Sequence, residues 1–151
     1  MTNKSLSGTL FTLFFCLSLF SQSSSKGVLE IKFTEIRSDN GLIAIGINTS
    51  PEGWPRKPQI ELNWKKEEVV NGTFTVKVPE LPFGTLAISV LDDENSNLEM
   101  DMRLGIPREG FGFSRDAPVR LSPPKYKESS FRFSRTGQQI TIRMKYMGKG
   151  R

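Results

Sequence analysis

The sequence predicts an all-β protein, a single antiparallel β-sandwich of about seven strands with immunoglobulin-like layering and a long acidic and glycine-rich loop. Apolar residues recur at every second position in several short segments, which is typical of strands with one buried face. Turn-forming residues separate these segments, and no segment after residue 25 keeps a helical period. Because each sheet must bury its apolar face against another layer, a two-sheet sandwich is the expected arrangement.

Residues 1–25 have the three-part layout of a secretory signal peptide. One basic residue, Lys4, precedes an apolar run from Leu10 to Phe20, and small polar residues follow it. The run is about half the length of a membrane-spanning helix, so a retained anchor is the alternative rather than the expectation. We therefore expect a secreted or periplasmic protein that meets the membrane only during export and loses Cys16 with the signal.

The remaining chain is expected to form one domain over residues 26–147, with a basic C-terminal tail at 148–151. It holds no cysteine and no histidine, which excludes disulfides, a thiolate nucleophile, an imidazole base and nitrogen-and-sulfur zinc sites. With 20 basic and 16 acidic residues after residue 25, the net charge of +5 falls to +4. A balance this small does not predict nucleic-acid binding.

The first two strands are expected on either side of the turn sequence SDNG at 38–41. In the segment 28–36, Leu29, Ile31 and Phe33 alternate with polar residues, and the apolar segment 42–48 follows the turn. Three prolines between residues 50 and 58 exclude a central strand there, so the segment 60–64 is expected as an edge strand.

Four more strands are expected further along the chain. The segments 73–78 and 85–91 are separated by PELPFG, and the segments 131–133 and 139–146 are separated by RTGQ, a predicted hairpin turn. Between these pairs lies the segment 92–129, far longer than an ordinary connection, and a loop of this length is usually functional or packed as a structured excursion.

Two blocks in and before this segment carry a resemblance. LPFGTLAISVLDDENSN, followed by GIPREGFGFS, resembles the bacterial secreted domains of domain of unknown function 2141, over about residues 28–146. That resemblance implies a sandwich similar to prealbumin-like and carboxypeptidase-regulatory domains. The family has no established activity, so the resemblance implies fold and location more than function.

The matching positions fall in a turn, an acidic loop and a glycine block. Asp92 stands where the family usually has histidine, Leu86 replaces a tyrosine, and Ser96 and Leu98 replace loop glycines. The matching residues are Leu81, Pro82 and Gly84; Asp93, Glu94, Asn95, Asn97 and Asp101; and Gly105, Pro107, Glu109, Gly110, Gly112 and Ser114.

The acidic loop DDENSNLEMD at 92–101 has oxygen donors at the alternate spacing of a calcium loop. Against calcium, Leu98 holds the position that favours glycine, and Leu104 holds that of the bidentate glutamate. The alternative is a structural loop of Asx turns with solvated carboxylates. The candidate calcium ligands are Asp93, Asn95, Asn97, Glu99 and Asp101.

Aromatic residues supply a second candidate site. They would form a stacking surface for a sugar or peptide, or the two phenylalanines would pin the long loop onto the core, which is the favoured interpretation because phenylalanine is usually buried. The candidate surface residues are Phe111, Phe113, Trp54, Trp64 and Tyr126.

The function expected from the sequence is a binding or structural module without catalytic activity. The alternative is a calcium-dependent protein that binds carbohydrate or a surface polymer, with a cell-surface polysaccharide or protein as partner. A carboxylate hydrolase ranks third, because nothing in the sequence indicates what would bury and perturb one of the acidic side chains. The oligomeric state stays open.

Overall fold

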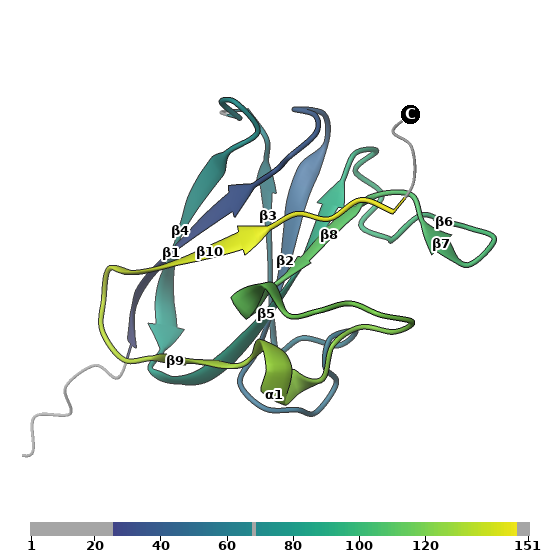
Figure 1. Cartoon of the computed structure of the whole chain (residues 1–151). Helices are drawn as coiled ribbons and strands as arrows, with labels where there is room; N and C mark the ends of the chain where they lie inside the picture. Colours follow the sequence, from purple (N-terminus) through teal and green to yellow (C-terminus); the bar gives the residue numbers. More distant parts are fainter. Residues whose placement is uncertain (1–25, 68, 148–151) are drawn as a thin grey trace, which may run out of the picture.

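The structure is a computed structural model that describes residues 26–67 and 69–147 (Figure 1). The expected signal peptide and basic tail lie outside the described residues. Ten strands form three sheets, together with two short helical turns. The elements are β1 (Lys26–Thr34), β2 (Leu42–Asn48), β3 (Ile60–Lys65), β4 (Phe74–Pro82), β5 (Gly84–Asp93), β6 (Met102–Arg103), β7 (Ile106–Pro107), β8 (Gly110–Phe113), η1 (Ser114–Asp116), α1 (Tyr126–Ser129), β9 (Phe131–Phe133) and β10 (Gln138–Arg143).

The first sheet has the strand order β10-β1-β4. Its central strand, β1, shows the expected alternation, because Leu29, Ile31 and Phe33 are fully buried while Lys32 is exposed. β4 pairs with β1 in the antiparallel sense, whereas β10 runs parallel to it.

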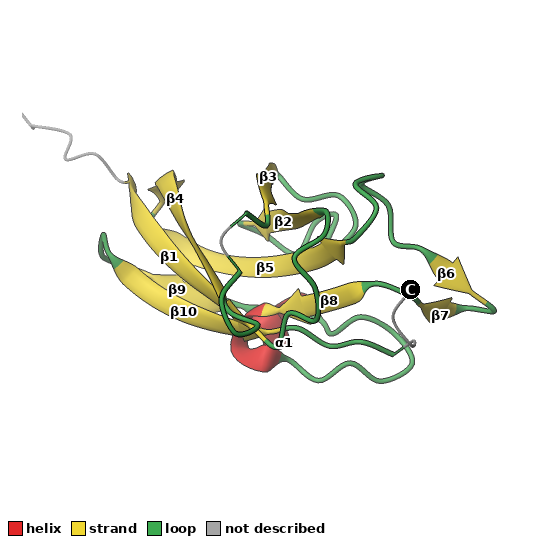
Figure 2. Cartoon of the chain, turned by 90° about the horizontal axis from the view of Figure 1, so that it is seen from above, coloured by secondary structure: helices red, strands yellow, loops and turns green. Residues whose placement is uncertain are grey.

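The second sheet has the order β3-β2-β5-β8, and β9 also pairs with the beginning of β5. β3 lies at the edge, as its proline-rich approach predicts. Inward-facing Ile43, Ile45 and Ile47 of β2 are at most 2% exposed. The third sheet is the small β6–β7 hairpin, which projects from the body of the molecule (Figures 1 and 2).

The two larger sheets contribute to one hydrophobic core. Residues of β1, β4 and β10 pack in the same cluster as residues of β2 and β5, including the fully buried Phe33, Ile88 and Ile142. Burial of each such side chain stabilises the fold by roughly 1.5–3 kcal/mol, so this shared interior holds the sheets together. Within the described ranges, no helix is long and apolar enough to cross a membrane.

The chain passes from one sheet to the other at Phe83, the single residue between β4 and β5. The ring of Phe83 packs on Phe133 of β9, with 5.0 Å between the ring centroids. PELPFG, which was expected to separate two strands, mostly continues β4, and only Phe83 lies between the two sheets.

Three expectations about the strands are corrected. The seven strands predicted by alternation form, but β6, β7 and β8 arise in the segment expected as loop, and this makes ten. The sheets are not wholly antiparallel, because β1 and β10 are parallel. RTGQ does not close a hairpin, since β9 pairs with β5 and β10 with β1. A strand with alternating apolar and polar residues can bury its apolar face in either sheet. A turn sequence next to it therefore does not determine which strand it pairs with.

Candidate functional site

Strand β8 has the sequence GFGF and is buried on both faces. A Cβ on Gly110 would lie 2.3 Å from the Tyr146 ring, and one on Gly112 would lie 2.6 Å from Ile142. The glycines therefore let β8 approach the C-terminal segment closely, while Phe111 and Phe113 take the opposite face. The different contacts of the two faces explain why glycine and phenylalanine occupy alternate positions in this strand.

The two phenylalanines form a second, smaller core on the outer side of the sheet. Phe111 and Phe113 are 6% and 8% exposed, and Trp54 packs against Phe113 with 5.8 Å between centroids. Tyr126 also packs against Trp54, with 6.0 Å between centroids, and the Trp54 indole donates to the carbonyl of Pro124 over 2.8 Å. Four of the five predicted aromatic residues are thus brought together.

The fifth aromatic residue, Trp64, lies elsewhere. It extends from β3 toward the edge of β4 and packs against the main core. The five residues therefore do not form one stacking surface. The other four are held mainly in ring-to-ring contacts, and this geometry supports the pinning interpretation for the two phenylalanines.

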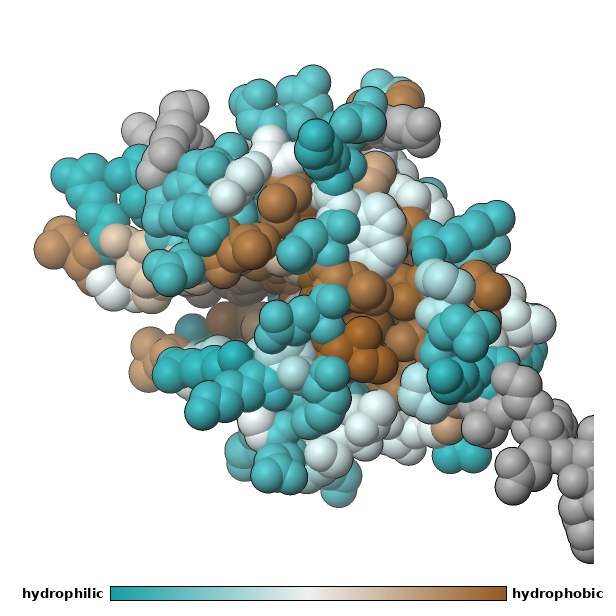
Figure 3. Space-filling view, turned by 180° about the vertical axis from the view of Figure 1, so that it is seen from behind, coloured by the Kyte–Doolittle hydropathy of each residue, from teal (hydrophilic) through white to brown (hydrophobic). Residues whose placement is uncertain are grey.

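A large apolar groove covers the outer face of the second sheet. It has a volume of about 830 Å³, within the range of small-molecule sites. Its floor crosses four strands, with Asn63 on β3, Gly46 on β2, Leu91 on β5 and Phe111 on β8. The space-filling view shows the hollow between two projecting parts, the β6–β7 hairpin and the loop at 117–123 (Figure 3).

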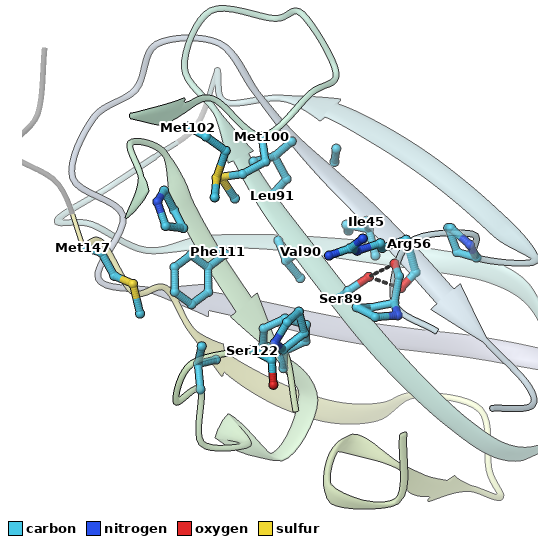
Figure 4. A pocket seen from close by; sticks show the side chains of 18 of the residues that line it. Ile45, Arg56, Ser89, Val90, Leu91, Met100, Met102, Phe111, Ser122 and Met147 are labelled. Atoms are coloured by element: carbon cyan, nitrogen blue, oxygen red, sulfur yellow. Dashed lines mark hydrogen bonds between the residues drawn. The ribbon is translucent and has the colours of Figure 1, made fainter. Parts of the chain in front are cut away.

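The walls of the groove carry apolar side chains that face solvent. Met102 and Ile106 of the hairpin are 56% and 51% exposed, and Met147 is 50% exposed. Leu121 on the opposite loop is fully exposed, and Leu98 is 56% exposed. In the close view, Met100, Met102 and Met147 surround Phe111 at one end, and Arg56 lies beside Ser89 toward the other (Figure 4).

The acidic loop is held by its own hydrogen bonds. The fully buried Asp93 accepts from the backbone N–H groups of Asn97 at 3.2 Å and Leu98 at 2.7 Å. Asn95 and Asn97 donate their side-chain amides to the Asp101 carboxylate at 3.1 and 3.3 Å. This is an Asx-turn arrangement, in which side-chain oxygens satisfy local backbone donors.

Two residues of this loop adopt left-handed backbone. Ser96 and Leu98 have φ of 61° and 62°, at the positions where the resemblance places glycine. Each such non-glycine residue costs roughly 1–2 kcal/mol. The Asp93 carboxylate, which accepts the backbone N–H groups of Asn97 and Leu98, offsets part of this cost.

The five candidate calcium ligands are only partly brought together. Asp93, Asn95, Asn97 and Asp101 lie in one hydrogen-bonded cluster, whereas the exposed Glu99 contributes its backbone N–H to Asn97. Among residues 26–67 and 69–147, no three acidic, histidine or cysteine side chains are grouped so that they could hold a metal ion. Calcium binding here stays a prediction.

Behind the loop lies a buried polar network centred on Asp92. The Asp92 carboxylate forms a salt bridge of 2.5 Å with Lys66 Nζ, and both side chains are fully buried. Lys66 also donates to the Ser38 carbonyl over 3.1 Å, and the Tyr146 hydroxyl donates to the second oxygen of Asp92. Burial and the Asp92 carboxylate raise the pKa of Tyr146 well above its ordinary value, so the phenol remains the donor.

A second ion pair extends this network to the surface. Arg37 binds both oxygens of Glu94, at 2.8 and 2.7 Å, and its guanidinium lies 4.4 Å from the Tyr146 ring centroid. The hydrogen bonds from Arg37 hold the pKa of Glu94 below its usual range, against the opposing effect of burial. The buried Glu109 accepts the backbone N–H groups of Glu94 and Asp101, both at 3.1 Å, and burial raises its pKa.

The Arg37–Glu94 pair predicts an acid sensitivity. Because the folded-state pKa of Glu94 is lowered, its stabilisation is present above the ordinary pKa of about 4.5 and is lost as the pH falls through the lower folded value. Glu109, with a raised pKa, acts in the opposite sense. We expect Glu94→Gln to be less stable than the wild type at neutral pH and to lose less stability on acidification.

Urea unfolding at several pH values between neutrality and the acid limit checks this expectation. Glu99→Gln, an exposed change in the same loop, is the matched control and should follow the wild type. If Glu94→Gln and the wild type lose stability in parallel as the pH falls, the Arg37–Glu94 ion pair is not the cause of the loss of stability in acid.

Neither the groove nor the partners of Asp92 were predicted from the sequence. A signal for the groove is present in a loop otherwise rich in charge, because Leu98, Met100, Met102, Leu104 and Ile106 occupy every second position, and all of them except Leu104 line the groove. The partners of Asp92 are more distant in sequence: Lys66 precedes it by 26 residues, and Tyr146 follows it by 54. No local pattern identifies them.

Comparisons with known proteins agree with the resemblance. A family model described as "Uncharacterized protein conserved in bacteria (DUF2141)" matches residues 31–141. No curated protein and no solved structure matches the chain significantly. The match covers most of the chain, and the protein therefore belongs to this bacterial family.

Proposed function

We propose that this DUF2141 protein is a secreted or periplasmic binding module, a β-sandwich without catalytic activity, whose ligand site is the apolar groove. The observation that carries the proposal is a groove of about 830 Å³ on a four-stranded floor. Contiguous exposed apolar surface of this kind usually marks an interaction site, because leaving it in water costs free energy.

The exposure of the groove walls supports a binding role. Five of the seven large apolar side chains that are exposed among the described residues line this one groove: Leu98, Met102, Ile106, Leu121 and Met147. Methionine is flexible and polarizable, so its side chain adapts to ligands of varied shape. The projecting hairpin and loop place these side chains opposite one another over the floor.

The positions of the carboxylates are the reason that we propose no catalytic activity. Asp92, Asp93 and Glu109 are buried in hydrogen bonds and ion pairs that stabilise the loop and its attachment. The groove contains one carboxylate side chain, that of Glu61, among its lining residues. An acid and base pair of the glycosidase kind requires two carboxylates that face one ligand.

Calcium-dependent binding of a carbohydrate or surface polymer stays the alternative. The aromatic rings that would stack on a sugar are largely covered by one another, and the groove walls are aliphatic rather than aromatic. Aliphatic walls favour an apolar ligand over a sugar, because they offer no flat ring face and few hydrogen-bonding groups.

Binding of the neutral apolar dye Nile red tests the proposed function. We expect saturable dye fluorescence with the wild type and about tenfold weaker binding with Met102→Asp or Leu121→Asp, because each places a charge in an apolar wall. Val70→Asp is the matched control, since Val70 is also exposed, at 66%, but does not line the groove.

The control also defines the contrary result. Dye binding that is absent in the wild type, or that Val70→Asp weakens as much as the wall variants, would remove the groove as the ligand site. Circular dichroism of each variant establishes that it remains folded.

A further inference from the structure

The groove is lined by more basic than acidic side chains. Arg56 and Arg120 line it together with a single acidic residue, Glu61. Both arginines are exposed, and neither forms an ion pair or side-chain hydrogen bond within the part of the chain that the structure describes. Elsewhere, Arg37 and Arg143 are paired with glutamates.

Arg56 is placed by its loop at the edge of the floor. Its neighbour Pro55 offers a carbonyl to the Ser89 hydroxyl at 3.5 Å, which ties this loop to β5. Trp54, two residues earlier, is anchored by its indole N–H and by Phe113. In the close view the Arg56 side chain lies over the floor beside Ser89 and Ile45, away from the methionine end (Figure 4).

The methionine side chains thus lie at one end of the groove and Arg56 lies toward the other, while Arg120 belongs to the loop at 117–123 that forms one wall. From β3 to β8 the floor spans three interstrand spacings, or about 14 Å. We propose that its ligand is an amphiphile with one alkyl chain and an anionic headgroup, in which the chain lies along the methionine and leucine walls and the headgroup binds Arg56, while Arg120 adds positive charge to the same groove. This inference rests on the proposed function and adds the chemical class of the ligand.

Physical chemistry favours the anion over a neutral or cationic headgroup. Guanidinium groups bind carboxylate and phosphate oxygens through two parallel N–H donors, and such charge-assisted bonds are stronger than neutral ones. The net charge of +4 after residue 25 further favours approach of an anion. The apolar walls supply binding free energy in proportion to the alkyl surface that leaves water.

The test compares three amphiphiles with the same chain: decanoate, decanol and decyltrimethylammonium, each measured by displacement of Nile red. We expect decanoate to bind about tenfold more tightly than decanol, with the cation weakest, because one charge-assisted hydrogen bond accounts for a factor of this size. The preference for decanoate should shrink in Arg56→Gln and Arg120→Gln and vanish in the double variant, while dye binding persists. Arg132→Gln, an exposed change on β9 outside the groove, should leave it intact.

Each contrary outcome has a distinct meaning. Equal affinity for decanoate and decanol, or a preference that survives in the double variant, overturns the anionic headgroup and leaves the groove as a binding site. Dye binding without displacement by any of the three overturns the amphiphile. Failure of the dye itself to bind overturns the proposed function. If sedimentation shows a dimer and Met102→Asp converts it to a monomer, the groove binds a second copy of the chain instead.

Discussion

Replacement of Lys66 by methionine is expected to lower the free energy of unfolding by about 3–5 kcal/mol, because it leaves the carboxylate of Asp92 buried without its cation. Both side chains are fully buried and lie 2.5 Å apart. Lys66 also anchors the carbonyl of Ser38, so the turn before β2 loses a donor as well. Urea unfolding followed by tryptophan fluorescence measures the loss.

The neighbouring residue supplies the matched control. Lys65→Met changes the same type of side chain at an exposed position and should cost less than about 0.5 kcal/mol. The double variant Lys66→Met with Asp92→Leu should recover much of the stability, because no charge then remains buried without a partner. Equal losses for Lys65→Met and Lys66→Met would show that the buried pair contributes nothing.

Replacement of Gly41 by alanine is expected to destabilise the protein by about 2–4 kcal/mol, the sum of backbone strain and overpacking. Gly41 has a φ of 78°, and an added Cβ would lie 1.9 Å from the carbonyl oxygen of Asp93. That oxygen belongs to the backbone at the end of β5, so it cannot move aside without disturbing the acidic loop. Thermal unfolding monitored by circular dichroism provides the measurement.

Gly137→Ala separates the two contributions. Gly137 has a similar φ of 71°, but nothing lies within 4 Å of its added Cβ. We expect this variant to lose about 1 kcal/mol, the strain alone. If the two alanine variants prove equally stable, the close approach of the turn to β5 does not constrain position 41.

The sequence predicts the strands of the main core better than it predicts the strand that lines the candidate site. The alternation of Leu29, Ile31 and Phe33 predicts β1 and its buried face, because a period of two directs successive side chains to opposite sides. The same rule fails for β8, where Gly110 and Gly112 disfavour a strand by themselves. Only contact with Tyr146 and Ile142 explains why glycine is required there.

The acidic loop shows the same limit in another form. The sequence places Asp93, Asn95, Asn97 and Asp101 at a spacing that suits either calcium or Asx turns. The structure assigns these groups to hydrogen bonds with one another and with the loop backbone. The spacing along the chain specifies which side-chain oxygens could bind calcium. It does not specify whether those oxygens already accept hydrogen bonds from the loop backbone.

The sequence by itself determined the all-β character of the protein and the positions of seven strands, because these depend on local periodicity and turn chemistry, and two sequence blocks identified its family. Only the tertiary structure decided which strands pair, which of two adjacent lysines is buried against Asp92, and that the loops enclose an apolar groove. These features depend on contacts between residues far apart in the chain, and the free energy that selects them arises only when the sheets and loops pack together.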